Sequence, residues 1–130
     1  MAGKLTFTGG IHPYDGKDIS KDKPIKDVLP KGDLVYPLSQ HIGAPAVPIV
    51  KKGDYVLTGQ KIAEAGGFVS APVYATVSGT VKAIEPHRVV TGDSVMSIVI
   101  ENDGKYDEVT YSSIESADDL SKEEILERIK

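Results

Sequence analysis

Apolar residues between positions 34 and 102 come in short runs that glycine and proline interrupt at close spacing. The runs are rich in Val, Ile, Tyr and Thr, a composition typical of β-strands, and this glycine density leaves no room for helices. Many small strands with frequent turns predict a mostly-β barrel or sandwich. The predicted strands are DLVYPL, PIVKK, DYVL, KIAEA, FVSAPV, ATVSGTVKAIE and SVMSIVIEN.

Residues 1–33 do not follow this pattern. They are rich in Gly, Pro, Lys and Asp and have few apolar positions. Proline can neither continue a helix nor donate to a strand ladder, so this segment is predicted to be an extended arm. We expect the arm to lie along the core domain, which spans residues 34–102.

Residues 103–130 are predicted to be an acidic linker and the start of a helix that leads into a further domain. Ser121 and Glu124 have the spacing of a capping box. Ile125, Leu126 and Ile129 then follow at helical spacing.

The apolar positions of the predicted strands also predict the core. The expected core residues are Val56, Ile62, Val77, Val81, Ile84, Val95, Ile98 and Ile100. Glycines have separate roles: Gly53 allows a positive φ angle in a turn where Asp54 bonds the backbone, and Gly79 allows close approach of two strands.

Two segments of the β region resemble each other. In each, Ala-Pro is followed by four residues and then Val, at Ala44–Val50 and Ala71–Val77, and a Gly-Asp-x-Val element follows further on. The similarity is either chance between two turn-rich segments or the trace of a pseudo-two-fold barrel with interlocking strands.

Composition removes several classes of function. The 130-residue chain has a net charge of −4, which gives no support to nucleic-acid binding. It has no cysteine, which excludes thiolate metal sites and cysteine nucleophiles within this chain. No apolar run approaches the roughly 20 residues needed to span a bilayer, so we expect no direct membrane insertion.

The candidate catalytic residues show no recognised pattern. The histidines, His12, His41 and His87, lack the spacing of metal ligands. We expect His12 and His41 to bond turn backbone and to hold the arm against the barrel. Ser39 and Ser78 have no nucleophile-elbow sequence around them.

The stretches VKKGDYVLTGQKIAEA and VSGTVKAIE resemble the biotinyl/lipoyl fold, the barrel-sandwich hybrid. Carriers of this fold hold the modified lysine at a hairpin tip. The resemblance places Gly66 and Gly67 at that tip, where no amine is available, and places Lys61 and Lys82 on the flanking strands.

A closer resemblance covers almost the whole chain. GGIHP, PLSQHIGAPA, GGFVSAPVYATVSGTVKAIE and SIVIENDG are similar to the N-terminal region of the RnfC subunit of the Rnf electron-transport complex. The resemblance implies a peripheral protein on the cytoplasmic face of the cell membrane, in a complex that couples electron flow between ferredoxin and NAD to ion transport. The remainder of such a subunit would bind FMN, NADH and 4Fe-4S clusters; for this chain alone we expect no cofactor.

Four hypotheses for the function remain open. The favoured one is a non-catalytic docking module whose partners are the downstream domains of its own subunit and other Rnf subunits. Its candidate docking residues are Gly66, Gly67, Phe68, His12 and His41. There are three alternatives. The chain could be a carrier domain with an unusual lysine, a stand-alone interaction module, or a small hydrolase or isomerase with a pocket between arm and barrel.

Overall fold

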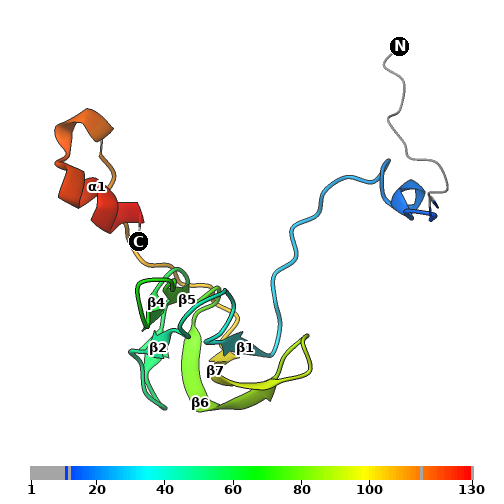
Figure 1. Ribbon diagram of the computed structural model, residues 1–130, viewed down its shortest axis with the longest axis horizontal. Helices are drawn as coiled ribbons and strands as arrows, with labels where there is room; N and C mark the ends of the chain where they lie inside the picture. Colours follow the sequence, from blue (N-terminus) through cyan, green and yellow to red (C-terminus); the bar gives the residue numbers. More distant parts are fainter. Residues whose placement is uncertain (1–10, 12, 115, 130) are drawn as a thin grey trace.

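The computed structural model describes residue 11, residues 13–114 and residues 116–129. Its centre is a flattened barrel of two sheets, flanked by an arm and a C-terminal helix (Figure 1). The elements are η1 (Lys17–Ile19), β1 (Asp33–Pro37), β2 (Val47–Pro48), β3 (Tyr55–Val56), β4 (Lys61–Glu64), β5 (Val73–Tyr74), β6 (Gly79–Arg88), β7 (Ser94–Asn102), η2 (Ala117–Asp119) and α1 (Lys122–Ile129).

The two sheets have the strand orders β1-β7-β6-β3 and β2-β4-β5, and every pair is antiparallel. The long strands β6 and β7 pair from Gly79 with Asn102 to Arg88 with Ser94. The hydroxyl of Tyr36 in β1 lies 2.9 Å from that of Thr76 and accepts the Thr76 N–H at 3.1 Å, which links the first sheet to the segment after β5. The mostly-β barrel predicted from the sequence is confirmed.

The core lies between the sheets. Six of the eight expected core residues are fully or almost fully buried, while Ile84 only packs against the core and Val95 is half-buried. The buried six are Val56, Ile62, Val77, Val81, Ile98 and Ile100.

Two glycines have the roles that the sequence predicts. Gly53 has a φ of 96°, and the carboxylate of Asp54 accepts the Lys51 N–H at 2.7 Å in the same turn. A Cβ added to Gly79 would lie 2.0 Å from the carbonyl oxygen of Glu101 in the paired strand. Close approach of β6 to β7 therefore requires glycine at position 79.

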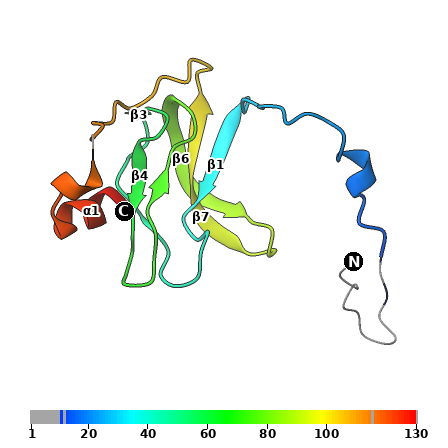
Figure 2. The ribbon, with the colours of Figure 1, turned by 90° about the horizontal axis from the view of Figure 1, so that it is seen from above.

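The arm departs from the expectation that it lies along the barrel. Its described part leaves the barrel at β1 and projects away from it (Figure 2), with Ile25 and Val28 almost fully exposed. Pro30 fastens the arm to the barrel, because its carbonyl accepts from Tyr106 at 2.6 Å and from Asn102 at 2.8 Å. The prolines that remove donors from the arm also prevent regular pairing with a sheet edge, which explains the difference.

The segment after β7 packs on the barrel over its first part. Thr58 donates its N–H to Asp107 and accepts one from Val109, at 2.8 and 3.0 Å. The Asp103 carboxylate accepts from the hydroxyls of Ser78 and Tyr55, each at 2.7 Å, and from the Lys105 N–H at 2.9 Å. These bonds, that of Lys105 first, hold the pKa of Asp103 below its ordinary value.

The lowered pKa of Asp103 predicts that the stability of the fold depends on pH. Because the pKa of Asp103 is lower in the folded chain, its contribution to stability is present above the unfolded-state pKa. That contribution is lost as the pH falls from about 5 through the folded-state pKa. We expect Asp103→Asn to lower the urea midpoint at pH 7 and to make its decline in acid shallower. If the urea midpoints of the unchanged protein and of Asp103→Asn declined in parallel with falling pH, Asp103 would not be the source of the pH dependence.

Helix α1 begins with the predicted capping box. The Ser121 N–H donates to the Glu124 carboxylate at 2.8 Å, and the Glu124 N–H donates back to the Ser121 hydroxyl at 3.3 Å. Bonding to Ser121 also lowers the pKa of Glu124. The Arg128 guanidinium donates to the carbonyl of Ser112 at 3.1 Å, which attaches the helix to the preceding segment.

Candidate functional site

Two loops lie side by side at one end of the barrel (Figure 2), and we call them the loop pair. Residues 38–46 connect β1 to β2, and residues 65–72 connect β4 to β5. Ala44 donates its N–H to the Val69 carbonyl at 2.9 Å. The Ser70 hydroxyl donates to the Ala44 carbonyl at 2.8 Å and accepts the Gly66 N–H at 2.9 Å. The loops therefore form one hydrogen-bonded unit.

The second loop overturns one strand prediction. The run FVSAPV was expected to be a strand, but residues 65–72 are a loop and strand β5 begins only at Val73. Pro72 cannot donate to a ladder, and the residues before it bond to the neighbouring loop instead.

Glycine allows the two loops to approach this closely. A Cβ added to Gly43 would lie 2.0 Å from the Val69 carbonyl oxygen, and one added to Gly66 would lie 2.0 Å from that of Pro45. Both contacts are with backbone, which cannot move aside as a flexible side chain would. Gly67 differs, because its added Cβ would meet only the Ala44 side chain, at 3.1 Å.

His41 joins the two loops, and its partners identify its protonation. The Ala71 N–H donates to Nε2 of His41 at 3.0 Å, so this nitrogen carries no proton. The proton is then on Nδ1, which donates to the Ile42 carbonyl at 3.0 Å. His41 thus bonds turn backbone as expected, but it holds the β4–β5 loop and not the arm. His12, the other histidine of that expectation, lies outside the described residues.

The tip of the loop pair is apolar. Phe68 has a relative exposure of 106%, Ile42 of 86% and Val69 of 53%. Residues 37–50 and 65–81 contain no Asp, Glu, Lys or Arg, although such residues make up 26% of the chain. Leaving a side chain such as Phe in water forgoes roughly 1.5–3 kcal/mol relative to burying it. An uncharged apolar projection of this kind is typical of an interaction site.

The lysines that flank the tip are both engaged elsewhere. Lys61 lies 3.3 Å from Glu64, and Lys82 lies 2.7 Å from Asp33. Each hydrogen-bonded carboxylate raises the pKa of its lysine. An amine must lose its proton to be acylated, so a raised pKa disfavours attachment of biotin or lipoate to either lysine. The position of both lysines on strands disfavours it as well.

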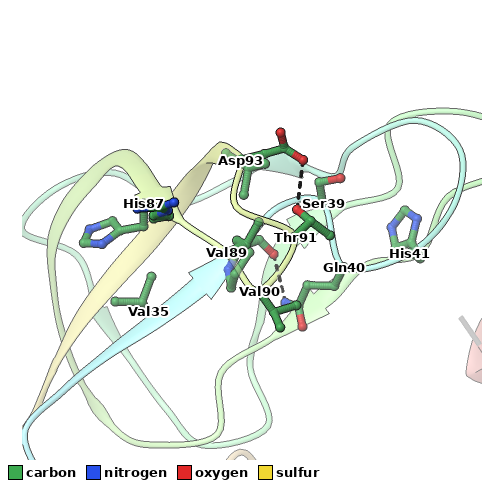
Figure 3. A pocket seen from close by; sticks show the side chains of 12 residues that line it. Val35, Ser39, Gln40, His41, His87, Val89, Val90, Thr91 and Asp93 are labelled. Carbon is green, nitrogen blue, oxygen red and sulfur yellow. Dashed lines mark hydrogen bonds between the residues drawn. The ribbon is translucent and has the colours of Figure 1, made fainter.

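A cleft with a volume of 660 Å³ lies between the β6–β7 turn and the loop after β1 (Figure 3). Two of its polar groups bond within their own turns: Gln40 donates to Pro37 at 2.8 Å, and Thr91 donates to Asp93 at 2.8 Å. His87 and His41 lie on opposite sides of the cleft. The one hydroxyl–carboxylate pair described here, Thr91 with Asp93, is confined to a single exposed turn.

A smaller pocket of 420 Å³ lies where the arm joins the barrel, between Leu29, Asn102 and Tyr106. Both polar side chains bond the Pro30 carbonyl. The pocket therefore holds the arm at this point. The Asp103 carboxylate in its lining is already bonded to Ser78, Tyr55 and the Lys105 N–H, which gives no support to the hydrolase hypothesis.

The chain does not fit the cofactors that the resemblance implies for the rest of the subunit. Without cysteine it offers no thiolate to an iron–sulfur cluster. The described α-helix, α1, has Glu123 and Glu124 in its first turn, which would repel a nucleotide phosphate. Across the described residues, no three His, Asp or Glu side chains gather as metal ligands.

A family model described as the RnfC barrel sandwich hybrid domain matches residues 5–105. The chain belongs to this family. It is 50% identical over 99 residues to the C subunit of the Na(+)-translocating ferredoxin:NAD(+) oxidoreductase complex of Acetobacterium woodii, covering 76% of this chain and 22% of that protein. It is 38% identical over 132 residues to the C subunit of the ion-translocating oxidoreductase complex of Haemophilus influenzae, covering 98% of this chain and 20% of that protein.

A third RnfC relative, from Clostridium ljungdahlii, is named as the C subunit of a proton-translocating ferredoxin:NAD(+) oxidoreductase complex. It is 46% identical over 101 residues, which are 77% of this chain and 22% of that protein. The chain thus spans about a fifth of the length of these relatives. In the described part of the chain, no helix has the length and hydrophobicity to cross a bilayer.

Proposed function

We propose that this chain is the N-terminal docking domain of an RnfC protein and that it performs no chemistry itself. The relatives are named as subunits of complexes that are oxidoreductases for ferredoxin and NAD and that translocate ions. In this proposal the whole subunit takes part in that electron transfer, as a peripheral protein at the cytoplasmic face of the membrane. FMN, NADH and the 4Fe-4S clusters would bind elsewhere in the subunit.

The loop pair is the observation that carries this proposal. By the resemblance to carrier domains it corresponds to the place where they hold their lysine, but it presents Phe68, Ile42 and Val69. A carrier arm must move between active sites, whereas these loops are tied together by His41, Ser70 and backbone bonds. A pre-organised apolar projection loses little freedom on binding, which favours docking.

The geometry also supports docking over a carrier with an unusual lysine. The tip has no lysine, and the nearest ones are paired with carboxylates on the strands. The docking residues in this proposal are Gly66, Gly67, Phe68 and His41, of which only Phe68 would supply substantial apolar contact. Gly66 and His41 set the shape of the tip, whereas at Gly67 an added Cβ would meet only the Ala44 side chain.

Replacing Phe68 with serine tests the proposal. The barrel should stay folded, because Phe68 is fully exposed in it, but binding to the rest of the subunit or complex should weaken by about 10-fold or more. The measurement is retention of the tagged domain by the remaining complex, with thermal unfolding of the isolated domain as a check on folding.

Val90→Ser is the matched control, because Val90 is also an apolar side chain at a hairpin turn and has a relative exposure of 104%. It should bind as the unchanged domain does. Equal retention of the Phe68→Ser and Val90→Ser variants would exclude the loop pair as the docking surface.

A further inference from the structure

His41 meets the β4–β5 loop through one ring nitrogen, and two backbone groups of the same residue lie within reach of it. Nε2 of His41 accepts the Ala71 N–H at 3.0 Å and lies 3.3 Å from the Ala71 carbonyl oxygen. An imidazole nitrogen without a proton accepts a hydrogen bond, whereas the same nitrogen in an imidazolium can only donate one. The Ala71 N–H is therefore the partner of a neutral His41, and the Ala71 carbonyl is the partner of a protonated one.

The other ring nitrogen keeps its role when the ring is protonated. Nδ1 of His41 donates to the Ile42 carbonyl at 3.0 Å, and it carries a proton in both forms of the ring. A proton taken up by His41 consequently goes to Nε2, at the contact with the β4–β5 loop. His41 is half-buried, so solvent reaches the ring and can supply that proton.

The loops themselves offer no charge to pair with an imidazolium, because residues 37–50 and 65–81 contain no Asp or Glu. Across the cleft, the β6–β7 hairpin presents one cation, one carboxylate and a second imidazole: Arg88, Asp93 and His87. The carboxylate of Asp93 is already bonded to the Thr91 hydroxyl in its own turn. On the other side of His41, the pocket beside it is lined by two titratable side chains, one from β1 and one from β5: Tyr36 and Tyr74.

We propose that His41 is a pH-sensitive latch of the loop pair. In its neutral form it holds residues 65–72 in the shape that docks, and in its protonated form it releases the Ala71 N–H and draws the Ala71 carbonyl toward the ring. Ala71 is three residues from Phe68, so this shift moves the apolar tip. The inference rests on the proposed function and adds the regulation of its docking surface. Imidazole is the side chain suited to such a role, since it changes charge between about pH 5 and 8.

Amide hydrogen exchange of this chain, followed residue by residue by NMR, tests the latch without any partner. From about pH 7.5 to about pH 5.5, the protection factor of the Ala71 N–H should fall by about 10-fold, because its acceptor is lost. The Gly53 N–H, which donates to the Val81 carbonyl at 2.8 Å elsewhere in the barrel, should keep its protection. In His41→Gln the side chain does not titrate, so the protection of the Ala71 N–H should not depend on pH over this range.

Retention of the tagged domain by the remaining complex, at the same two pH values, tests the regulation of docking. Retention of the unchanged domain should fall by about 5-fold relative to that of His41→Gln, since the variant corrects for any titration of the complex itself. His87→Gln is the matched control, because it removes the histidine on the opposite side of the cleft. It should respond to pH as the unchanged domain does.

The other outcomes separate the latch from the docking function. Constant protection of the Ala71 N–H, or an equal fall in His41→Gln, would overturn the latch and leave the docking function standing. Loss of that protection with no change in retention would overturn the regulation of docking. Failure of the docking function itself would appear as equal retention of Phe68→Ser and Val90→Ser, a result on which the Ala71 measurement does not depend.

Discussion

Replacing Gly66 with alanine is expected to disrupt the loop pair and weaken docking by roughly 100-fold or more. The added Cβ would lie 2.0 Å from the Pro45 carbonyl oxygen, so the two loops must separate. Separation breaks the bonds of Ser70 and displaces the whole apolar tip, whereas Phe68→Ser removes one side chain from an intact tip. The free energy of unfolding of the domain should fall by only about 1–3 kcal/mol, because the steric overlap is confined to loops.

Gly67→Ala is the control for this experiment, since the neighbouring glycine differs only in what its Cβ would meet. That Cβ would contact the Ala44 side chain at 3.1 Å, which a small shift relieves. Retention by the complex and the urea midpoint should both stay close to those of the unchanged protein. If Gly66→Ala bound as tightly as Gly67→Ala, the geometry of the loop pair would have no role in docking.

Replacing Gly79 with alanine is expected to destabilise the barrel by about 3 kcal/mol or more. Its Cβ would lie 2.0 Å from the carbonyl oxygen of Glu101, and Gly79 pairs with Val56 on one side and Asn102 on the other. The strands on both sides would have to move, and they belong to the four-stranded sheet that forms half of the core. Urea unfolding of the isolated domain measures the effect.

Gly92→Ala provides the comparison for Gly79→Ala. Gly92 has a φ of 93° in the β6–β7 turn, and an added Cβ would meet no heavy atom within 4 Å. Its cost should therefore be the conformational strain alone, about 1–2 kcal/mol. If both variants lost the same free energy of unfolding, the close approach of β6 to β7 would not be the reason that position 79 requires glycine.

The strands that the sequence predicts best are those with continuous apolar runs in the core. SVMSIVIEN coincides with β7, because three successive positions from Ile98 to Ile100 are buried and the run is bounded by polar turns. FVSAPV fails because its composition is that of a strand while Pro72 and the bond of Val69 to Ala44 place it in a loop. Composition alone does not reveal whether a partner strand is available.

The candidate site could be predicted only in part. The resemblance to carrier domains placed Gly66 and Gly67 at a hairpin tip, and the structure places both in the loop between β4 and β5. In the loop between β1 and β2, His41 was predicted but Gly43 and Ile42 were missed, because this loop meets the tip through contacts between residues 26 to 30 positions apart in the chain. A signal was present, since residues 37–50 and 65–81 are both free of charged residues in a highly charged chain.

The central claim is that Phe68 is exposed in this domain and covered in the complex, and thiol labelling measures this directly. The chain has no cysteine, so Phe68→Cys introduces a unique thiol in the isolated domain, and Val90→Cys introduces a matched one. Mass mapping of maleimide adducts should show similar rates at both positions in the isolated domain. In the assembled complex, labelling at position 68 should slow by on the order of 10-fold or more while position 90 is unchanged. Equal labelling of position 68 in the domain and in the complex would contradict the account.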